Sequence, residues 1–394
     1  MKAVILAAGK STRTHPLTIN RPKCLLKVAN KTILGHILNK LEGLVEEAII
    51  VIGHCGEQIS NHFGSSYGKI KITYVQQKSQ LGTGNALSSA ENLVSDRFIV
   101  LMGDDIYSRE DIERCLEHEY CILAKEVKDV SSFGEVVAND KFLSDIKEKP
   151  ESGSEGLANT GLYVLDKNIF AVIKKLKKSS RGEYEVTDAV RAFAKKKKII
   201  VERADFWLPV TYPWSLLDAN EAVSDNISSD VYATVEKGAI IKGKVFVGRN
   251  SLIRSGAYIE GPVVIGENCD IGPNCYIRAF SSIGNNCRIG NAVEVKNSIV
   301  MDNTHIGHLS YVGDSVIGEN VNLGAGFIVA NLRHDNETVK SVVKEELIST
   351  GRRKFGTIIA ENVKTGIRTS VYPGRKIWPN KTTLPGEIVK RDIT

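Results

Sequence analysis

The second half of the chain carries an apolar residue at every sixth position. A period of six fits neither the 3.6-residue repeat of a helix nor the strict alternation of an ordinary strand. It is typical of a hexapeptide β-helix, in which short strands alternate with tight turns and the inward side chains stack into one column. The unbroken series is Ile241, Val247, Ile253, Ile259, Ile265, Ile271, Ile277, Ile283, Ile289, Val295 and Met301.

Beyond Met301 the count changes phase near His305 and then continues. A polar stretch over 333–353 interrupts it, and we predict a projecting loop there. Because the flat sides of a β-helix are often covered by neighbouring chains, we predict a homotrimer. The later apolar positions are Ile317, Leu323, Val329, Ile359, Val371, Ile377 and Val389, with Thr365 and Thr383 filling two places in the series.

The chain up to about residue 220 alternates strand-like and helix-like patterns instead. This rhythm predicts a parallel sheet with helices on both faces, which binds ligands at the carboxyl ends of its strands. A polar link over 224–230 separates the two patterns, so we predict domains at 1–225 and 233–394. The predicted strands are 3–7, 48–52, 70–75 and 98–102, and the predicted helices are 33–41 and 85–92.

Composition agrees with a soluble protein of more than one domain. The chain has 394 residues, 42% hydrophobic and 25% charged, and no apolar run approaches the ~18 residues that span a bilayer. The apolar start stops at Gly9 and reads as a buried strand, not a signal peptide. We therefore expect a cytoplasmic protein that does not contact a membrane.

The net charge of +6 raises the question of nucleic acid, because lysine clusters at 174–178 and 195–198. No aromatic residues interleave these lysines, and both runs fall where helices should end, where cations are favoured. We expect solvated helix ends and no nucleic acid. The seven cysteines form no C-x-x-C pair, which argues against a zinc site and for reduced packing residues.

Candidate chemistry begins where the first predicted strand ends. Small residues, Ala8 and Gly9, let backbone N–H groups approach phosphate oxygens there. Arg13 and Lys23 follow and supply the cations that a pyrophosphate leaving group needs. Asp104 follows the strand over 98–102, where a carboxylate can hold Mg²⁺ against a phosphate.

These motifs together resemble the sugar-1-phosphate nucleotidylyltransferase family. The resemblance implies in-line attack of a sugar phosphate on the α-phosphorus of UTP or dTTP, with Arg13 and Lys23 as catalytic cations and Asp104 as the Mg²⁺ ligand. It implies nucleotide binding by Ala8, Gly9, Gln77, Gly82 and Thr83, and sugar-phosphate binding by Gly134, Glu148, Lys149 and Asn159.

The chain departs from this family at several positions. Ser11, Thr14 and Lys27 replace residues of the glycine-rich motif and its flank. Pro209 stands where the family has a second metal-binding aspartate after a tryptophan, and Asp105 is a possible substitute. Either the metal relies on Asp104, phosphates and water, or the nucleotidyl-transfer half is weakened.

A second candidate site lies where the hexapeptide count changes phase. His308 is an imidazole that can take a proton from an amine attacking a thioester. Its surroundings resemble the acetyltransferase half of the bifunctional glucosamine-1-phosphate acetyltransferase/N-acetylglucosamine-1-phosphate uridylyltransferases, a left-handed β-helix, in their archaeal form with a segment similar to 350–354. The resemblance implies His308 as general base, amino-sugar-phosphate binding by Arg278, Lys296, Tyr311 and Asn322, and acetyl-CoA binding by Ala325 and Asn331.

The sequence thus favours a bifunctional enzyme that acetylates an amino-sugar 1-phosphate and couples the product to a nucleotide. Three alternatives stay open: acetyl transfer alone, given Pro209; a mannose-1-phosphate guanylyltransferase-like enzyme with a structural β-helix; and a non-enzymatic scaffold like exchange-factor subunits of translation initiation. The retained Arg13, Lys23 and Asp104 weigh against the scaffold, and the surroundings of His308 weigh against a purely structural β-helix. Glucosamine and galactosamine, and UTP and dTTP, are not distinguished.

Overall fold

A computed structural model of the chain describes residues 1–148, 150 and 155–394. The contacts divide it into two compact units. The first unit comprises 1–10, 21–25 and 33–209, and the second comprises 11–20, 26–32 and 210–394. The two short N-terminal segments therefore belong with the C-terminal part of the chain, which the sequence pattern does not indicate.

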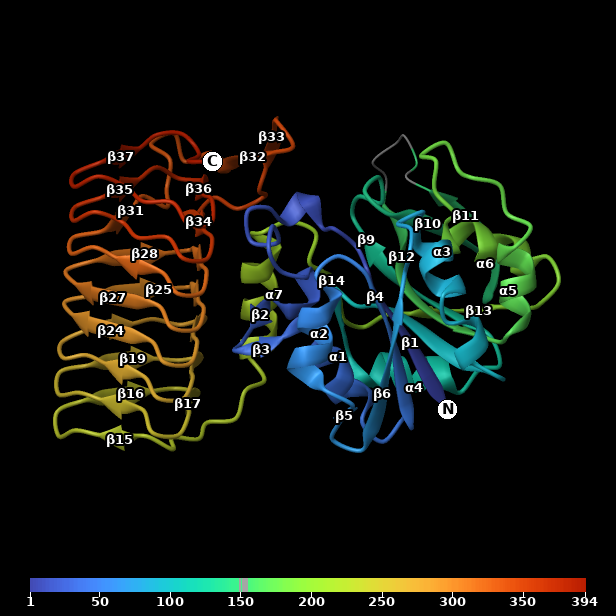
Figure 1. Ribbon diagram of the computed structural model, residues 1–394, viewed down its shortest axis with the longest axis horizontal. Helices are drawn as coiled ribbons and strands as arrows, with labels where there is room; N and C mark the ends of the chain where they lie inside the picture. Colours follow the sequence, from blue (N-terminus) through green and yellow to red (C-terminus); the bar gives the residue numbers. More distant parts are fainter. Residues whose placement is uncertain (149, 151–154) are drawn as a thin grey trace. The chain divides into compact units, whose positions relative to one another are not determined.

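The first unit is built on a ten-stranded sheet (Figure 1). β1 pairs in parallel with β4 and β7, and β4 pairs in parallel with β6, as predicted. Beyond these predicted strands the sheet is mixed, because β12 runs antiparallel to both β7 and β9. In sheet order the strands are β10 (Gly134–Asn139), β11 (Phe142–Glu148), β13 (Ile200–Arg203), β9 (Cys121–Val127), β12 (Gly156–Leu165), β7 (Phe98–Met102), β1 (Lys2–Ala7), β4 (Glu47–Ile52), β6 (Ile70–Gln76) and β5 (Ser66–Tyr67).

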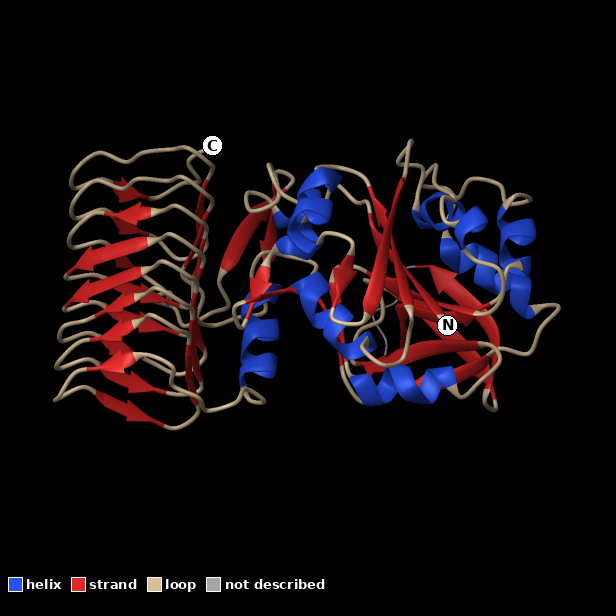
Figure 2. Ribbon diagram, turned by 60° about the horizontal axis from the view of Figure 1, so that its bottom comes forward, coloured by secondary structure: helices blue, strands red, loops and turns tan. Residues whose placement is uncertain are grey.

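Helices cover both faces of this sheet, as predicted (Figure 2). Alternate residues of β1 point into two separate cores on the two faces of the sheet. Val4 lies in the core that contains α6, and Ile5 lies in the core that contains α1. The helices are α1 (Ile33–Leu41), α2 (Gly56–Phe63), α3 (Thr83–Ser88), α4 (Arg109–Leu116), α5 (Asn168–Ile173) and α6 (Val186–Ala194), with short 3₁₀ turns η2 (Lys23–Leu25) and η3 (Glu91–Leu93); β8 (Asp105–Tyr107) and β14 (Trp207–Pro209) form a small antiparallel pair.

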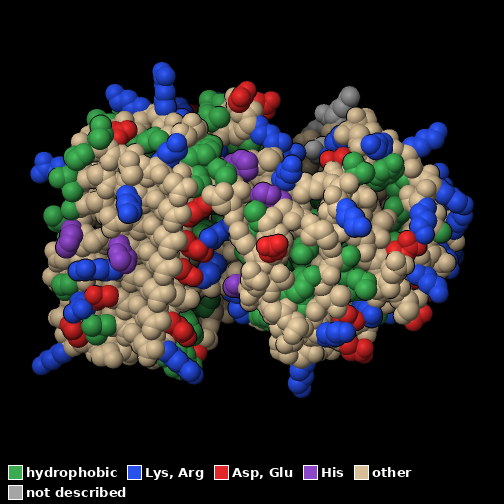
Figure 3. Space-filling model, viewed as in Figure 1, with side chains coloured by type: hydrophobic (Ala, Val, Ile, Leu, Met, Phe, Trp, Pro, Cys, Tyr) green, Lys and Arg blue, Asp and Glu red, His purple; other side chains and the backbone are tan. Residues whose placement is uncertain are grey.

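The two lysine runs directly follow α5 and α6, where the sequence predicts helix ends. Lys and Arg side chains gather at the surface over this part of the first unit (Figure 3). Among the described residues, no helix has the length and apolar character needed to cross a membrane. The seven cysteines are free thiols, and six of them are buried, as their predicted packing role requires.

The second unit is a three-sided coil of parallel strands, visible as stacked strands in Figure 1. Each strand pairs with the third strand after it for most of the length, so the chain visits three sheets in turn. The six-stranded sheet contains β15 (Thr234–Val235), β18 (Leu252–Ile253), β21 (Asp270–Ile271), β24 (Arg288–Asn291), β27 (His305–His308) and β30 (Asn322–Leu323). The eight-stranded sheet contains β16 (Ile240–Lys242), β19 (Tyr258–Glu260), β22 (Tyr276–Ile277), β25 (Glu294–Lys296), β28 (Tyr311–Gly313), β31 (Ile328–Val329), β35 (Ser370–Val371) and β37 (Ile388–Val389). The seven-stranded sheet contains β17 (Val245–Val247), β20 (Val263–Ile265), β23 (Ser281–Ile283), β26 (Ile299–Val300), β29 (Val316–Ile317), β34 (Thr357–Ile359) and β36 (Arg375–Ile377).

The apolar residues of the six-residue count fill the inside of this coil, but in three columns and not in the single column predicted. Ile253 pairs with Ile271, and Ile271 pairs with Ile289, so one coil consists of three hexapeptides. Each sheet therefore contributes its own inward column. From Val247 to Val295 every member of the series is fully buried.

The predicted phase change is real but lies earlier than the sequence count placed it. Ile283 pairs with Val300, so Val300 and not Met301 continues the column. The corner after Val295 is one residue shorter than its counterparts, and the corner between Val312 and Ile317 is short in the same way. The predicted loop over 333–353 projects as an antiparallel hairpin of β32 (Lys340–Val343) and β33 (Glu346–Ser349).

Helix α7 (Ser215–Ser224) and the β2–β3 hairpin (Lys27–Val28 and Lys31–Thr32) pack onto the coil within the second unit. The fully buried Asn220 connects them. Its Nδ2 donates to the Phe280 carbonyl over 2.7 Å, and its Oδ1 accepts from the Ala29 N–H over 2.8 Å. The helix that closes the predicted N-terminal domain is therefore physically part of the coil unit.

Candidate functional site

In the first unit, the candidate site is built on the carboxyl ends of the central strands. Ala8 and Gly9 follow β1, and Gln80 Nε2 donates to the Ala8 carbonyl over 2.9 Å. A Cβ on Gly53, after β4, would lie 2.4 Å from that same carbonyl oxygen. The N–H of Gly103, after β7, donates to the backbone of β1 over 2.9 Å. The turns after three neighbouring strands therefore meet at one edge, as the parallel pattern predicts.

Two of the predicted residues form an ion pair at this edge. Lys23 Nζ lies 2.6 Å from Asp104 Oδ2, across 81 positions of sequence. The Lys23 side chain is 9% exposed and the Asp104 side chain is 37% exposed, so an oxygen ligand with solvent access sits beside a nearly buried cation. Arg13 lies on the 3₁₀ turn η1 (Thr12–Thr14), which belongs to the second unit. The two predicted catalytic cations therefore fall in different units.

The sequence has no second metal-binding carboxylate at position 209, and the structure shows what surrounds this position. Pro209 pairs with Asp105 across the β14–β8 ribbon. Asp105 is 8% exposed, and its Oδ2 accepts from the Trp207 indole N–H over 3.0 Å. The suggested substitute ligand is thus a buried carboxylate that already holds a tryptophan.

The donor set at Asp104 fits Mg²⁺ better than a metal held in a protein cage. Among the residues that the structure describes, no three His, Cys, Asp or Glu side chains gather as a metal site. Mg²⁺ keeps several waters and is commonly bound by one or two carboxylates together with substrate phosphates. A single carboxylate at Asp104 is compatible with that mode.

The predicted nucleotide-binding residues Gln77, Gly82 and Thr83 make close contacts with their surroundings. Gln77 is 6% exposed, and its Nε2 donates to the Gly82 carbonyl over 3.1 Å and to Asn85 Oδ1 over 2.9 Å. Gly82 has φ 104°, and a Cβ there would lie 2.5 Å from the Tyr184 carbonyl oxygen. Thr83 Oγ1 accepts from the backbone at the start of α6 over 3.0 Å. Only glycine fits at position 82, and the amide of Gln77 is fixed in orientation.

Three of the four predicted sugar-binding residues come together on the antiparallel strands. Gly134 pairs with Glu148. A Cβ on Gly134 would lie 3.1 Å from Glu148 Oε2 and 3.6 Å from the Asn159 Cβ. Asn159 Nδ2 donates to the Tyr163 hydroxyl over 2.6 Å. Lys149, the fourth, lies outside the described residues.

Arg181 is a residue that the sequence analysis missed. Its guanidinium lies 2.9 Å from Glu148 and also pairs with Glu185, which is 5% exposed. These residues line a cavity of about 690 Å³ together with Asp188 and Arg191. Arg181 lies within one of the polar lysine-rich connections, where nothing in the local pattern distinguishes it from solvated cations.

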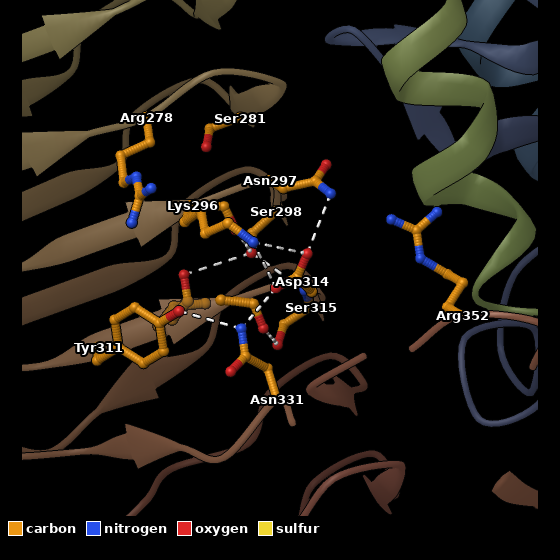
Figure 4. Close-up of polar contacts among 12 residues, drawn as sticks. Arg278, Ser281, Lys296, Asn297, Ser298, Tyr311, Asp314, Ser315, Asn331 and Arg352 are labelled. Carbon is orange, nitrogen blue, oxygen red and sulfur yellow. Dashed lines mark hydrogen bonds and ion pairs between the residues drawn. The ribbon is translucent and has the colours of Figure 1, made fainter. Parts of the chain in front are cut away.

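In the second unit, four predicted residues gather on or just after strands of the eight-stranded sheet (Figure 4). Lys296 Nζ lies 2.9 Å from Asp314 Oδ2. Asn331 Nδ2 donates to Asp314 over 2.5 Å and to the Tyr311 hydroxyl over 3.0 Å. Arg278 occupies the preceding coil, where its Nη1 lies 2.9 Å from Glu294 Oε1.

The electrostatics of this cluster favour a neutral phenol beside charged neighbours. Burial, followed by the nearby Asp314 carboxylate, raises the pKa of Tyr311. The hydrogen bond that Arg278 donates to Glu294 is the main cause that raises the pKa of Arg278. Tyr311 therefore keeps its hydroxyl proton at neutral pH and can donate it to a ligand.

His308 and Ala325 lie together at a different corner, between the six-stranded and eight-stranded sheets. His308 ends β27 and is exposed, and the Gly326 N–H donates to its carbonyl over 3.1 Å. Asn322 lies on β30 of the six-stranded sheet, where it pairs with His305. One chain thus places Asn322 on a different sheet from Tyr311.

Asp314 and Arg352 are further residues whose roles the sequence did not indicate. Asp314 is 2% exposed at the centre of the Figure 4 cluster. Arg352 pairs with Asp218 and, over 2.5 Å, with Glu221, both on α7. Of these two residues, only Asp314 stands out in the sequence, because it places a carboxylate at a coil corner where the preceding coil has Asn297.

Comparison with known proteins gives matches along the whole chain. Residues 2–226 match the nucleotidyl transferase family, and residues 259–389 match the GMPPB C-terminal domain. The chain is 42% identical to the bifunctional protein GlmU of Methanocaldococcus jannaschii, over 100% of this chain and 96% of that one. It is 39% identical to a bifunctional sugar-1-phosphate nucleotidylyltransferase/acetyltransferase of Sulfurisphaera tokodaii, over 100% and 98% of the two chains.

Solved structures resemble the first unit. A crystal structure of a putative glucose-1-phosphate thymidylyltransferase from Bacillus anthracis aligns with TM-score 0.52 and 29% identity, covering 58% of this chain and 96% of that one. A UDP-glucose pyrophosphorylase complexed with UDP-glucose aligns with TM-score 0.51 and 24% identity, covering 57% and 99%, and supports the fold.

Proposed function

Because this chain belongs to the family of bifunctional sugar-1-phosphate nucleotidylyltransferase/acetyltransferases, and its first part to the nucleotidyl transferases, we propose that it carries out two transfers. The coil acetylates glucosamine 1-phosphate with acetyl-CoA. The first unit joins N-acetylglucosamine 1-phosphate to UMP from UTP and releases pyrophosphate. The observation that carries the proposal is the presence of two separate polar sites in one chain, the Lys23–Asp104 pair and the cluster around Asp314.

For nucleotidyl transfer the protein supplies position and positive charge. Ala8 and Gly9 offer backbone N–H groups to the triphosphate, and Lys23 Nζ balances charge on the departing pyrophosphate. Glu148 and Asn159 bind sugar hydroxyls, and Gln77 reads the pyrimidine edge. A Mg²⁺ ion held by Asp104 and the phosphates would neutralise charge on the α-phosphate.

For acetyl transfer, His308 accepts the proton that the 2-amino group loses as it attacks the thioester carbonyl, and the C–S bond then breaks to release coenzyme A. The N–H of Ala325, at the same corner, donates to the oxyanion. Arg278 and Lys296 bind the sugar phosphate, Tyr311 binds the sugar, and Asn331 binds the acetyl-CoA side.

We further propose that the coil is a left-handed β-helix that assembles as a homotrimer. Outward apolar side chains along it stay exposed in the single chain, including Leu309 at 63% and Ile328 at 43%. Exposed apolar surface of this kind is typical of protein–protein interfaces, and we assign these side chains to the contact between copies. The proposed sugar-binding residues Asn322 and Tyr311 lie on different sheets of one chain, so assembly would allow two copies to contribute them to one site. Sedimentation as a stable monomer would remove this part of the proposal.

Pro209 favours a second candidate function, acetyl transfer with a weak or absent nucleotidyl transfer. Residue 209, which pairs with Asp105, is a proline and supplies no carboxylate to a metal ion. Two assays on the purified protein separate the candidates: coenzyme A release from acetyl-CoA and glucosamine 1-phosphate, and pyrophosphate release from UTP, Mg²⁺ and N-acetylglucosamine 1-phosphate. Release in both supports the bifunctional enzyme, release of coenzyme A alone supports the second candidate, and release in neither refutes both.

A further inference from the structure

We propose that Asp314 is a positioning residue of the acetyl-transfer site, a buried carboxylate that fixes Lys296 and Asn331 to receive the amino-sugar phosphate and acetyl-CoA. The inference rests on the proposed acetyl transfer and adds a residue to it. It arises from the contacts of Asp314 alone, since neither a motif nor a period assigns this residue a role.

The Asp314 carboxylate is saturated with donors from three side chains. Lys296 Nζ lies 3.1 Å from Oδ1 and 2.9 Å from Oδ2. Asn297 Nδ2 donates to Oδ1 over 3.1 Å, and Asn331 Nδ2 donates to Oδ2 over 2.5 Å. At 2% exposure the carboxylate depends on these donors for its solvation. Figure 4 shows them converging on it from successive coils.

The corner itself does not require a carboxylate. Asn297 and Asp314 occupy the equivalent short corners of successive coils, both with left-handed backbones, φ 44° and φ 51°. Asparagine is as suitable as aspartate for such a conformation. A column of amides would therefore make the turns equally well, and what the acid adds is a negative charge within reach of Lys296.

The fixed position of Lys296 depends on that charge. A lysine side chain has about 2 kcal/mol of rotamer entropy, so an unpaired lysine spends much of its time away from one productive geometry. The Lys296 ammonium has three donors, and its contacts with Asp314 leave capacity for a phosphate oxygen. Asn331 uses the same Nδ2 on Asp314 and on the Tyr311 hydroxyl, so the carboxylate also orients the residues around the sugar.

Asp314 is itself held in place, through Asn297 by α7 and through its own backbone by the coil. Asn297 Nδ2 donates to Glu221 Oε1 of α7 over 2.9 Å as well as to Asp314. The Asp314 backbone N–H donates to the Lys296 carbonyl over 2.9 Å, and its carbonyl accepts from the Gly356 N–H over 2.8 Å. Asp314 is thus held by the coil and by α7, and it transmits that rigidity to two ligand-binding side chains.

The test is the Asp314→Asn variant in the full-length protein. Its corner folds, as Asn297 shows one coil earlier, but an amide cannot accept from all three side chains. We expect the KM for glucosamine 1-phosphate to rise at least about tenfold, the size of a lost hydrogen bond to a charged group. The KM for acetyl-CoA should rise too, while kcat stays within about threefold because His308 is untouched. In Lys296→Met the added Asp314→Asn change should raise the sugar-phosphate KM no further, because the two act as one unit.

Asp270→Asn is the matched control. It removes a carboxylate paired with Arg254 over 2.5 Å on the same coil unit, and both KM values should stay at those of the unaltered protein. A KM for glucosamine 1-phosphate that is unchanged or lower in Asp314→Asn overturns the inference, as does failure of that variant to fold, which would assign the carboxylate to the coil and not to the site. Absence of acetyl transfer in the unaltered protein would refute the proposed function instead.

Discussion

The burial of Lys376 predicts how the free energy of unfolding depends on pH. This lysine of β36 is 1% exposed. Its Nζ donates to the Val342 carbonyl and lies 6.0 Å from the centre of the Trp214 ring. Burial lowers the pKa of Lys376 to about 8 from its ordinary 10.5, although the Asp392 carboxylate opposes the shift. The perturbation that isolates this effect is Lys376→Met, which keeps the length of the side chain and removes the charge.

Proton linkage sets the sign and the size of this pH effect on the free energy of unfolding. The folded state binds the Lys376 proton more weakly than the unfolded state, so protonation lowers the free energy of unfolding. The full penalty applies below about pH 8 and is relieved as the pH rises toward 10.5. Each pKa unit corresponds to about 1.4 kcal/mol, so the full penalty is about 3 kcal/mol, of which about 2 kcal/mol is relieved between about pH 7 and about pH 9.5.

The assay is urea unfolding of the unaltered protein and Lys376→Met at these two pH values, followed by circular dichroism. The unaltered protein should gain about 2 kcal/mol relative to the variant on going to the higher pH. Lys364→Met, an exposed lysine on the same unit, is the control and should track the unaltered protein. Parallel pH profiles for the unaltered protein and Lys376→Met would refute the reasoning.

Three further predictions address the two sites. Lys23→Met should lower the rate of uridylyl transfer by about 10²–10³-fold, because it removes a cation 2.6 Å from Asp104, and should leave acetyl transfer intact; a near-normal pyrophosphate release rate would contradict its role. His308→Ala should do the reverse and lower coenzyme A release by about 10²–10⁴-fold, and loss of both activities in the folded variant would argue against independent sites. Pro209→Asp should lower the Mg²⁺ concentration for half-maximal uridylyl transfer, because it adds a carboxylate opposite Asp105; an unchanged Mg²⁺ dependence would mean that this position does not serve the metal.

Local periodicity predicted many of the helices and strands of the fold. The predicted helix 33–41 and strand 98–102 match α1 and β7 residue for residue, because an amphipathic or fully apolar run reports its own burial. The antiparallel strands of the sheet were not predicted, because the direction of β12 depends on which distant strand it pairs with. The shift of the column to Val300 was missed because Met301 is also apolar and buried, so the count alone does not distinguish the two.

The candidate sites divide in the same way. Lys23 and Asp104 could be proposed from the sequence because each follows a recognisable strand or motif, and the structure brings their charges together. Arg181 was missed because only folding brings it beside Glu148. Asp314 was visible in the chain but without a role, since its partners lie one coil before and one coil after it.

The sequence by itself determined that the chain contains an α/β unit followed by a coil of hexapeptides, because both patterns are written in neighbouring residues and depend only on burial. Tertiary structure decided which polar side chains meet. The stacking of coils placed Asp314 between Lys296 and Asn331, and the packing of α7 onto the coil placed Arg352 against Asp218 and Glu221. Those contacts join residues far apart in the chain, and no local preference encodes a contact whose partner is fixed only when the backbone has closed.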